Sequence, residues 1–146
     1  MLSPFTEFLA TLAGGLFTGA AVYVTLVEHP ARVSCGSALA VNEFRPSYKR
    51  AAVMQATLAL VGAAAALVRW GVSDGRGWLA GGLLLGAVIP FTVFVIGPTN
   101  KRLFEGSLDL NSPESANLLT RWGRLHTVRS AASLVAFLIF VFLLVR

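Results

Sequence analysis

The chain has 146 residues, of which 55% are hydrophobic and only 13% charged, and its formal net charge is +5. Soluble globular domains carry about 25% charged residues, so this composition indicates a single membrane-embedded domain. The basic residues stand beside apolar segments instead of forming a polar, aromatic-interleaved surface, which argues against nucleic-acid binding, and one cysteine, Cys35, excludes an intramolecular disulfide and a cysteine-based metal cluster.

Four segments are long and apolar enough to span a bilayer, which takes roughly 17 to 25 residues. They are residues 4–27, 51–68, 77–97 and 126–145. The first does not resemble a signal peptide, because MLSPFTEF has no basic residue before the apolar run. Four spans predict an all-α, four-helix membrane bundle in one domain, residues 1–146, with both termini on the same side.

The links between the spans differ in length. RWGVSDGRG predicts a tight hairpin between the second and third spans, whereas the other two links are much longer. In the first long link, Pro30, Gly36 and Pro46 argue against a long uninterrupted helix, leaving only a short one within residues 32–41. In the second, Ser112 as N-cap and Pro113 at the first helical position predict a short interfacial helix, residues 113–119.

Small residues predict close helix packing. GLFTG contains Gly15 and Gly19, and GLLLG contains Gly82 and Gly86, both with the spacing that lets backbones approach within a chain or in a homo-oligomer. Pro90 lies in the middle of the third span and predicts a kink there.

Charge predicts the orientation in the membrane. Nine of the twelve Lys and Arg residues lie on the face of the two long links. The positive-inside rule therefore predicts an integral membrane protein with the long links in the cytoplasm and both termini on the opposite side.

The start of the fourth span divides into two faces at 100° per residue. Arg121 and Arg124 point toward lipid headgroups. The other face is an inward stripe of Trp122, His126, Arg129 and Ser130. Arg129 lies about one turn deeper than His126, so it should face the bundle interior or a wet cavity.

Polar side chains from all four helix ends predict a cup at this membrane surface. The candidate catalytic residues are His29, Asn100, His126 and Arg129, and the candidate substrate-binding residues are Glu28, Tyr48, Gln55, Trp122 and Ser130. A histidine base with Arg129 and Asn100 as oxyanion stabilisers suits an aromatic or quinone-like molecule from the bilayer. The alternatives are interfacial hydrogen bonding by the histidines and a structural ion pair between Arg129 and Glu28.

No metal or cofactor is expected, because no HxxxH, ExxH or cysteine cluster supplies metal-ligand spacing. Haem bound between His29 and His126 is the alternative that the spacing leaves open. The lack of inverted repeats argues against transport.

The motifs VEHPAR, FRPSYKRA, GPTNKRL and WGRLHTVRS, each at a helix end, resemble the anthrone oxygenase-like family of small four-helix membrane proteins, mostly domains of unknown function. The resemblance covers nearly the whole chain. It implies an oxidoreductase, specifically cofactor-independent oxidation of anthrones to anthraquinones by dioxygen, with His29, Asn100, His126 and Arg129 as its polar site residues. A non-catalytic lipid- or quinone-binding protein, or a small subunit of a membrane complex, is the alternative function.

Overall fold

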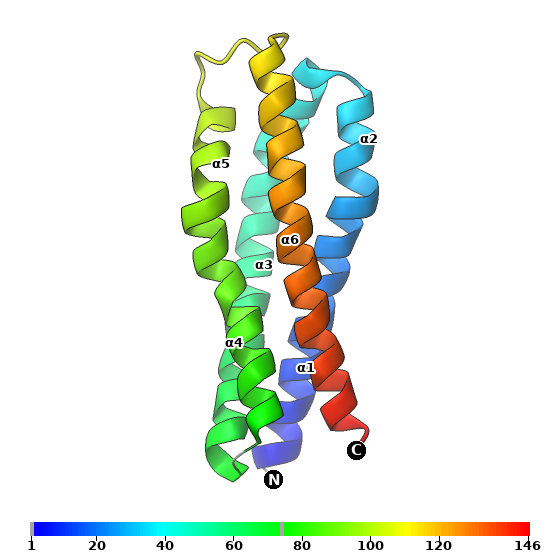
Figure 1. Cartoon of the computed structure of the whole chain (residues 1–146), viewed down its shortest axis with the longest axis vertical. Helices are drawn as coiled ribbons and strands as arrows, with labels where there is room; N and C mark the ends of the chain where they lie inside the picture. The colour runs from blue at the N-terminus through cyan, green and yellow to red at the C-terminus, as the bar shows by residue number, and fades with distance from the viewer. Residues whose placement is uncertain (1, 74) are drawn as a thin grey trace.

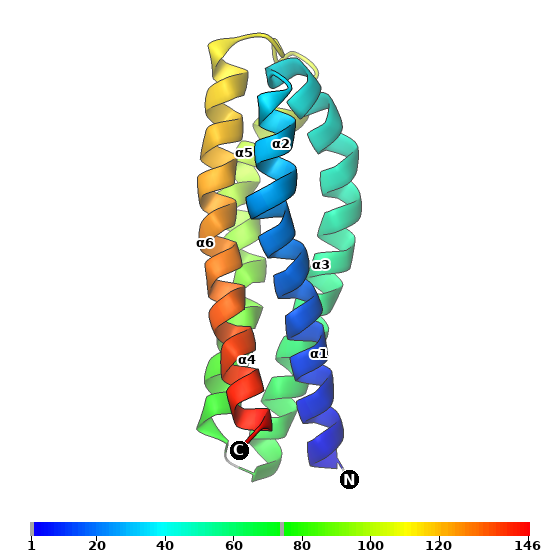
Figure 2. The same ribbon diagram turned by 90° about the vertical axis from the view of Figure 1, so that its right-hand side faces the viewer.

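The computed structural model describes residues 2–73 and 75–146, and it confirms an all-α bundle of four long helical rods. The first rod contains α1 (Leu2–Tyr23), the π-helix η1 (Val24–Glu28) and α2 (His29–Ser34); the second is α3 (Ser37–Ser73); the third contains α4 (Arg76–Phe91), the π-helix η2 (Thr92–Ile96) and α5 (Gly97–Phe104); the fourth is α6 (Pro113–Leu144). Figures 1 and 2 show the rods side by side, with both chain termini at one end of the bundle.

All four rods are long and apolar enough to cross a membrane, and each overlaps one of the predicted spans. With 37 residues, α3 is about 55 Å long at 1.5 Å per residue, which exceeds the roughly 30 Å hydrocarbon core of a bilayer. The rods are therefore longer than this hydrocarbon core is thick, and each contains an apolar segment long enough to cross it.

The link between the first two rods is helical where the sequence predicted interruption. The first rod continues through Pro30, and α3 continues through Pro46; the chain reverses only at Cys35 and Gly36, whose φ is +92°. The expectation of no long helix is wrong, and the π-helix η1, which ends two residues before Pro30, is the local feature that accommodates this proline, because its wider turn relieves the contact between the proline ring and the carbonyl of the preceding turn. Pro46 lies on the exposed side of α3, where the carbonyl that loses its donor is not buried.

The other two links are close to their predictions. Ser112 is the N-cap of α6, and its hydroxyl accepts a hydrogen bond from the Ser115 N–H at 3.3 Å. Residues 113–119, expected as a separate helix, are instead the first turns of α6. The predicted hairpin lies between Ser73 and Arg76, and Asp74 within it is outside the described residues.

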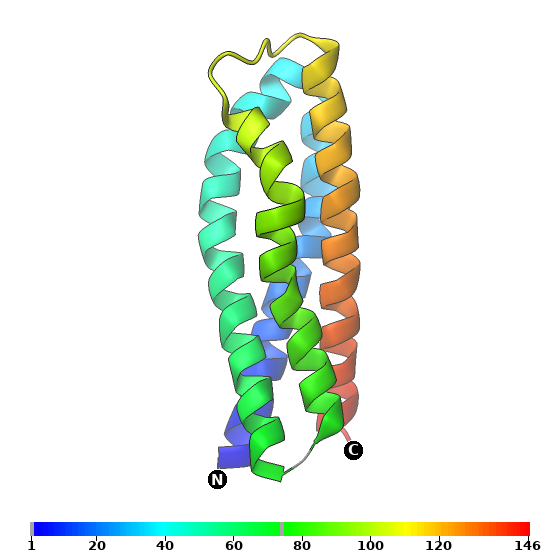
Figure 3. The same ribbon diagram turned by 60° about the vertical axis from the view of Figure 1, so that its left-hand side comes forward.

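Two π-helical segments interrupt the rods at similar heights. η2 begins two residues after Pro90, and Figure 3 shows the third rod bending between α4 and α5, as the proline predicted. A π-turn contains one residue more than an α-turn and is frequently found at functional sites. Both segments contribute side chains to the cavity described below.

Close packing near the chain termini involves the predicted glycines. A Cβ added at Gly82 would lie 3.0 Å from Ala66 Cβ, and a Cβ added at Gly86 would lie 3.4 Å from Ala63 Cβ. The GLLLG motif therefore lets α4 pack closely against α3. At Gly15 a Cβ would lie 2.8 Å from Phe137, whereas at Gly19 it would meet nothing within 4 Å. The lower half of the bundle is thus tightly packed.

Candidate functional site

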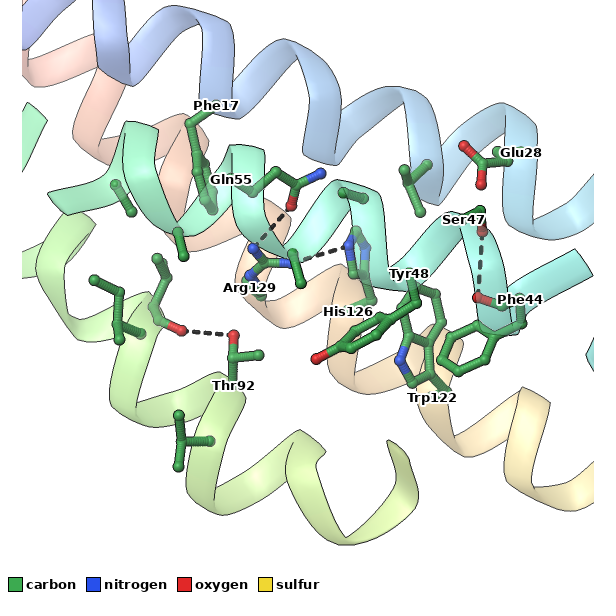
Figure 4. A pocket seen from close by; sticks show the side chains of 18 of the residues that line it. Phe17, Glu28, Phe44, Ser47, Tyr48, Gln55, Thr92, Trp122, His126 and Arg129 are labelled. Carbon is green, nitrogen blue, oxygen red and sulfur yellow. Dashed lines mark hydrogen bonds between the residues drawn. The ribbon is translucent and has the colours of Figure 1, made fainter. Parts of the chain in front are cut away.

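A cavity of about 220 Å³ lies inside the bundle, between a lower core cluster around Phe17 and Phe140 and an upper one around Phe44 and Trp122. All four rods line it, and Figure 4 shows its side chains. Its charged and hydrogen-bonding lining residues are Glu28, Arg32, Ser47, Tyr48, Gln55, Thr92, Trp122, His126 and Arg129. Pockets for drug-sized ligands measure about 300–1,000 Å³, so this cavity suits a compact molecule.

Arg129 is the charged group deepest in the site. It is 8% exposed, donates a hydrogen bond to Gln55 Oε1 at 2.8 Å, and lies over the ring of Phe17 at 4.9 Å. No carboxylate in the described chain forms an ion pair with it; Glu28, the partner considered from the sequence, pairs with Arg32 instead. A buried cation held only by neutral groups is costly, and an anionic or oxygen-bearing ligand would lower that cost.

His126 is held by hydrogen bonds on both ring nitrogens. Its Nε2 lies 3.3 Å from Arg129 Nη1, and its Nδ1 lies 2.9 Å from the Thr25 hydroxyl. A guanidinium can only donate, so Nε2 must accept and Nδ1 must carry the proton of a neutral imidazole. The basic lone pair of His126 therefore points toward Arg129 (Figure 4).

Thr25 belongs to η1, and its hydroxyl lies at the centre of a short polar chain. It is 2.7 Å from the Ser130 hydroxyl and 2.9 Å from the Ala21 carbonyl oxygen. This chain ties the first rod to α6 directly behind the His126 ring. Thr25 was not among the residues predicted for the site, although its position one turn before His29 was a signal for it.

Tyr48 projects into the cavity with one hydrogen bond already made. Its hydroxyl oxygen accepts from Asn100 Nδ2 at 2.6 Å, and Asn100 Oδ1 accepts from Trp122 Nε1 at 2.9 Å. Accepting from Asn100 leaves the Tyr48 O–H free to donate to a ligand. Asn100 does not line the cavity, so it acts on the site by orienting Tyr48 and Trp122.

Arg32, which sequence reasoning counted only as a topology charge, is buried in the cavity wall near the long links. It forms ion pairs with Glu28 and, at 2.7 Å, with Glu43, and donates to Ser47 Oγ at 3.3 Å. Glu28 and Arg32 are four residues apart on a helix, and this spacing could have predicted their ion pair from the sequence. This cluster forms a polar wall of the cavity.

His29 lies away from the cavity. Its ring is 5.0 Å from the Trp122 ring, and an added Cβ at Gly123 would lie 2.6 Å from its Nε2, so the ring fills a notch on α6. Among the nine predicted site residues, His29, Asn100 and Ser130 do not line the cavity; the six that do are Glu28, Tyr48, Gln55, Trp122, His126 and Arg129.

The two imidazoles do not form an open pair of ligands for haem, because both pack against the Trp122 indole, His126 with its ring centroid at 4.6 Å. In the described part of the chain, no group of three or more His, Cys, Asp and Glu side chains is placed to hold a metal ion. The arrangement instead places one cation without a carboxylate partner, Arg129, beside one imidazole and one phenol, and the ion-paired Arg32 lies in another part of the cavity wall.

Comparisons with known proteins bear on this site. No curated protein and no solved structure matches the chain. The model of a protein family described as anthrone oxygenase matches residues 44–139, about two thirds of the chain. The match includes Tyr48, Gln55, Trp122, His126 and Arg129, whereas the first rod, with Thr25 and Glu28, precedes it. The chain belongs to the anthrone oxygenase family.

Proposed function

We propose that the protein oxidises an anthrone-like aromatic ketone to the corresponding quinone with dioxygen, inside the cavity of the bundle. The observation that supports this most strongly is the buried guanidinium of Arg129. It has no carboxylate partner in the described chain and lies 3.3 Å from the lone-pair nitrogen of His126. A base next to an anion-stabilising group is what deprotonation of a carbon conjugated with a carbonyl group requires.

The first step is proton removal from the methylene carbon opposite the anthrone carbonyl. His126 Nε2 takes this proton, and the electron pair delocalises onto the carbonyl oxygen as a phenolate. Arg129 and the free O–H of Tyr48 stabilise that oxyanion, and the shift of Arg129 toward it frees the Nε2 lone pair of His126.

Dioxygen then completes the oxidation. The carbanion transfers one electron to dioxygen, and the resulting radical pair combines into a carbon-bound peroxide, which takes the proton held by His126. Loss of the second methylene proton to His126 with cleavage of the O–O bond gives the new carbonyl group and hydroxide, and protonation of that hydroxide releases water. Overall, one anthrone and one dioxygen give one quinone and one water. The two C–H bonds of the methylene group each lose two electrons, and these electrons reduce one oxygen atom to the new carbonyl oxygen and the other to water.

The test is turnover of anthrone by the protein in lipid nanodiscs, followed by quinone absorbance and oxygen uptake. We expect one oxygen consumed per quinone formed. Arg129→Gln should lower the rate about 10²–10³-fold, the effect of removing one oxyanion donor. Arg121→Gln, an exposed change on the same helix, is the matched control. A wild-type rate no higher than the protein-free oxidation of anthrone would refute the proposal.

A second candidate function is quinone or lipid binding without catalysis. It is favoured by the same two donors, because Arg129 and Tyr48 could hold a carbonyl oxygen whether or not His126 acts as a base. Tight binding of anthraquinone with no oxidation of anthrone, together with a stoichiometric protein partner on purification, would support this alternative.

We also propose that the long links face the cytoplasm, on the basis of the distribution of Lys and Arg. Cys35 is the chain's single cysteine and is exposed at the turn between α2 and α3. Labelling by a membrane-impermeant maleimide in inverted vesicles, but not in intact cells, is the expected result. The reverse pattern would overturn this orientation.

A further inference from the structure

We infer that the cavity opens sideways into the bilayer through a gap between α3 and η2, and that a flat hydrophobic ligand reaches Arg129 through this gap from the lipid phase. The chemical class of the ligand rests on the proposed function; the position of the opening rests on the structure alone. We call this opening the lateral portal and define it by Ala52, Ala56, Ile89 and Val93.

Two residues mark the portal because they have one side on the cavity and one side outside. Ala56 on α3 and Val93 on η2 both line the cavity, yet both are exposed, Val93 by 59%. A side chain with both properties lies in the outermost part of the cavity wall, and the cavity is partly open to the outside, not fully enclosed. The two residues belong to neighbouring rods, so the opening lies between those rods.

The helix pair α3 and α4 explains why the gap exists at this height. Nearer the chain termini, Ala63 and Ala66 contact Gly86 and Gly82 closely. One to three turns toward the long links, Ala59, Ala56 and Ala52 line the cavity. The third rod bends after Pro90, where η2 adds a residue to one turn (Figure 3). Whereas α4 packs extensively against α3, η2 and α5 make few contacts with it.

The portal lies on the hydrocarbon side of the membrane surface. The exposed basic pair Lys49 and Arg50 precedes the apolar span, as headgroup-level residues do. Ala56 is six residues further along α3, about 9 Å deeper at 1.5 Å per residue. Phe94, next to Val93, is 77% exposed and belongs in a lipid environment.

The remaining walls are poor routes for an apolar ligand. Toward the long links, the ion pairs of Arg32 with Glu28 and Glu43 bound the cavity, and an apolar molecule passing there would disturb charges that need their partners. On the side of α1 and α6, the buried rings of Phe17 and Trp122 close the wall. The lateral portal is the wall built from alanine and aliphatic side chains.

The test is the rate at which anthraquinone, dissolved in lipid vesicles, reaches the reconstituted protein. Quenching of tryptophan fluorescence reports its arrival, because Trp122 is in the cavity wall. Ala56→Phe should lower the association rate about tenfold, within the range by which access changes alter on-rates, and should leave the final quenching unchanged. Ala64→Phe, an exposed alanine on the same helix outside the cavity lining, is the control and should leave the rate unchanged.

A second variant tests the opposite direction: Val93→Ala widens the portal and should raise the association rate. The inference is overturned if Ala56→Phe and Val93→Ala both associate at the wild-type rate, or if anthraquinone causes no quenching in the wild type. Its failure is separable from that of the proposed function. Slowed association in Ala56→Phe with no anthrone oxidation by the wild type would support the portal and refute the oxygenase function. Anthrone oxidation by the wild type with unchanged association in both variants would support the oxygenase function and refute the portal.

Discussion

Gln55 on α3 accepts a hydrogen bond of 2.8 Å from Arg129 on α6, across the cavity and 74 residues apart in the chain. The amide satisfies one N–H of the guanidinium without neutralising its charge. The cavity therefore keeps a buried positive charge that is available to a ligand.

Gln55→Glu should stabilise the protein and inactivate it. A carboxylate of the same shape would pair with Arg129 and compensate its buried charge, raising the free energy of unfolding by roughly 1–3 kcal/mol, the scale of hydrogen bonds to charged groups. The same pairing would remove the charge that stabilises the oxyanion, so turnover should fall by about 10²-fold. Thermal unfolding and anthrone oxidation measure the two effects.

Gln55→Leu is the control for that substitution. It removes the acceptor without supplying a charge, so stability and turnover should both fall. Wild-type turnover by Gln55→Glu would show that the free charge of Arg129 is not used in the reaction.

Thr25→Val should lower kcat about tenfold and leave KM unchanged, because Thr25 orients the base His126 without touching the ligand. The effect should be smaller than that of losing the base itself, which is about 10²–10⁴-fold. Valine keeps the shape of threonine and removes the hydroxyl that lies 2.9 Å from His126 Nδ1. Thr25→Ser restores a hydroxyl and should recover most of the rate. Equal loss in both variants would mean that Thr25 contributes packing only.

Tyr48→Phe should lower turnover by about 10²-fold through loss of one donor to the oxyanion, and it should cost about 1–3 kcal/mol of stability because one Asn100 N–H loses its acceptor. Asn100→Ala should differ, because it removes the partner of both Tyr48 and Trp122. Leaving such buried groups unsatisfied costs about 1–3 kcal/mol each, so this variant should lose stability first. Parallel measurement of steady-state kinetics and thermal unfolding separates the two roles.

Gly123→Ala should lower stability by about 1–3 kcal/mol, since its Cβ would displace the His29 ring from the notch, as in overpacked cores. Gly19→Ala, also within a helix but facing open space, is the control and should be neutral or slightly stabilising. The turnover of the folded fraction of Gly123→Ala should stay near that of the wild type. A loss of kcat without a loss of stability would instead indicate that His29 acts as a base, as the sequence suggested.

Several features of this molecule could be predicted from the sequence because they depend on one helix at a time. The inward stripe of Trp122, His126, Arg129 and Ser130 is buried, whereas Arg121 and Arg124 are exposed. The 3.6-residue period fixes which side chains of one helix share a face. The cost of exposing Arg129 to hydrocarbon then determined that this face turns inward.

The composition of the cavity wall depended on relations between helices. Periodicity does not fix how far each rod is rotated or how the rods separate, so it assigned His29 to the cup and missed Arg32, Thr25 and the alanines of α3. η1 adds a residue to one turn, which rotates the residues after it by about 100° relative to a regular helix. The continuation of the helices through Pro30 and Pro46 likewise depended on where each proline falls along and around its rod.

Four helices long and apolar enough to span a membrane, and the buried stripe on the fourth of them, follow from the sequence alone, because the hydrophobic effect and the helical period act locally along the chain. The packing of the rods against one another decides that Arg129 meets Gln55 and that alanines, not large side chains, face the gap beside η2. Those outcomes depend on packing between segments distant in sequence and on two π-turns, whose positions the local pattern of residues does not reveal.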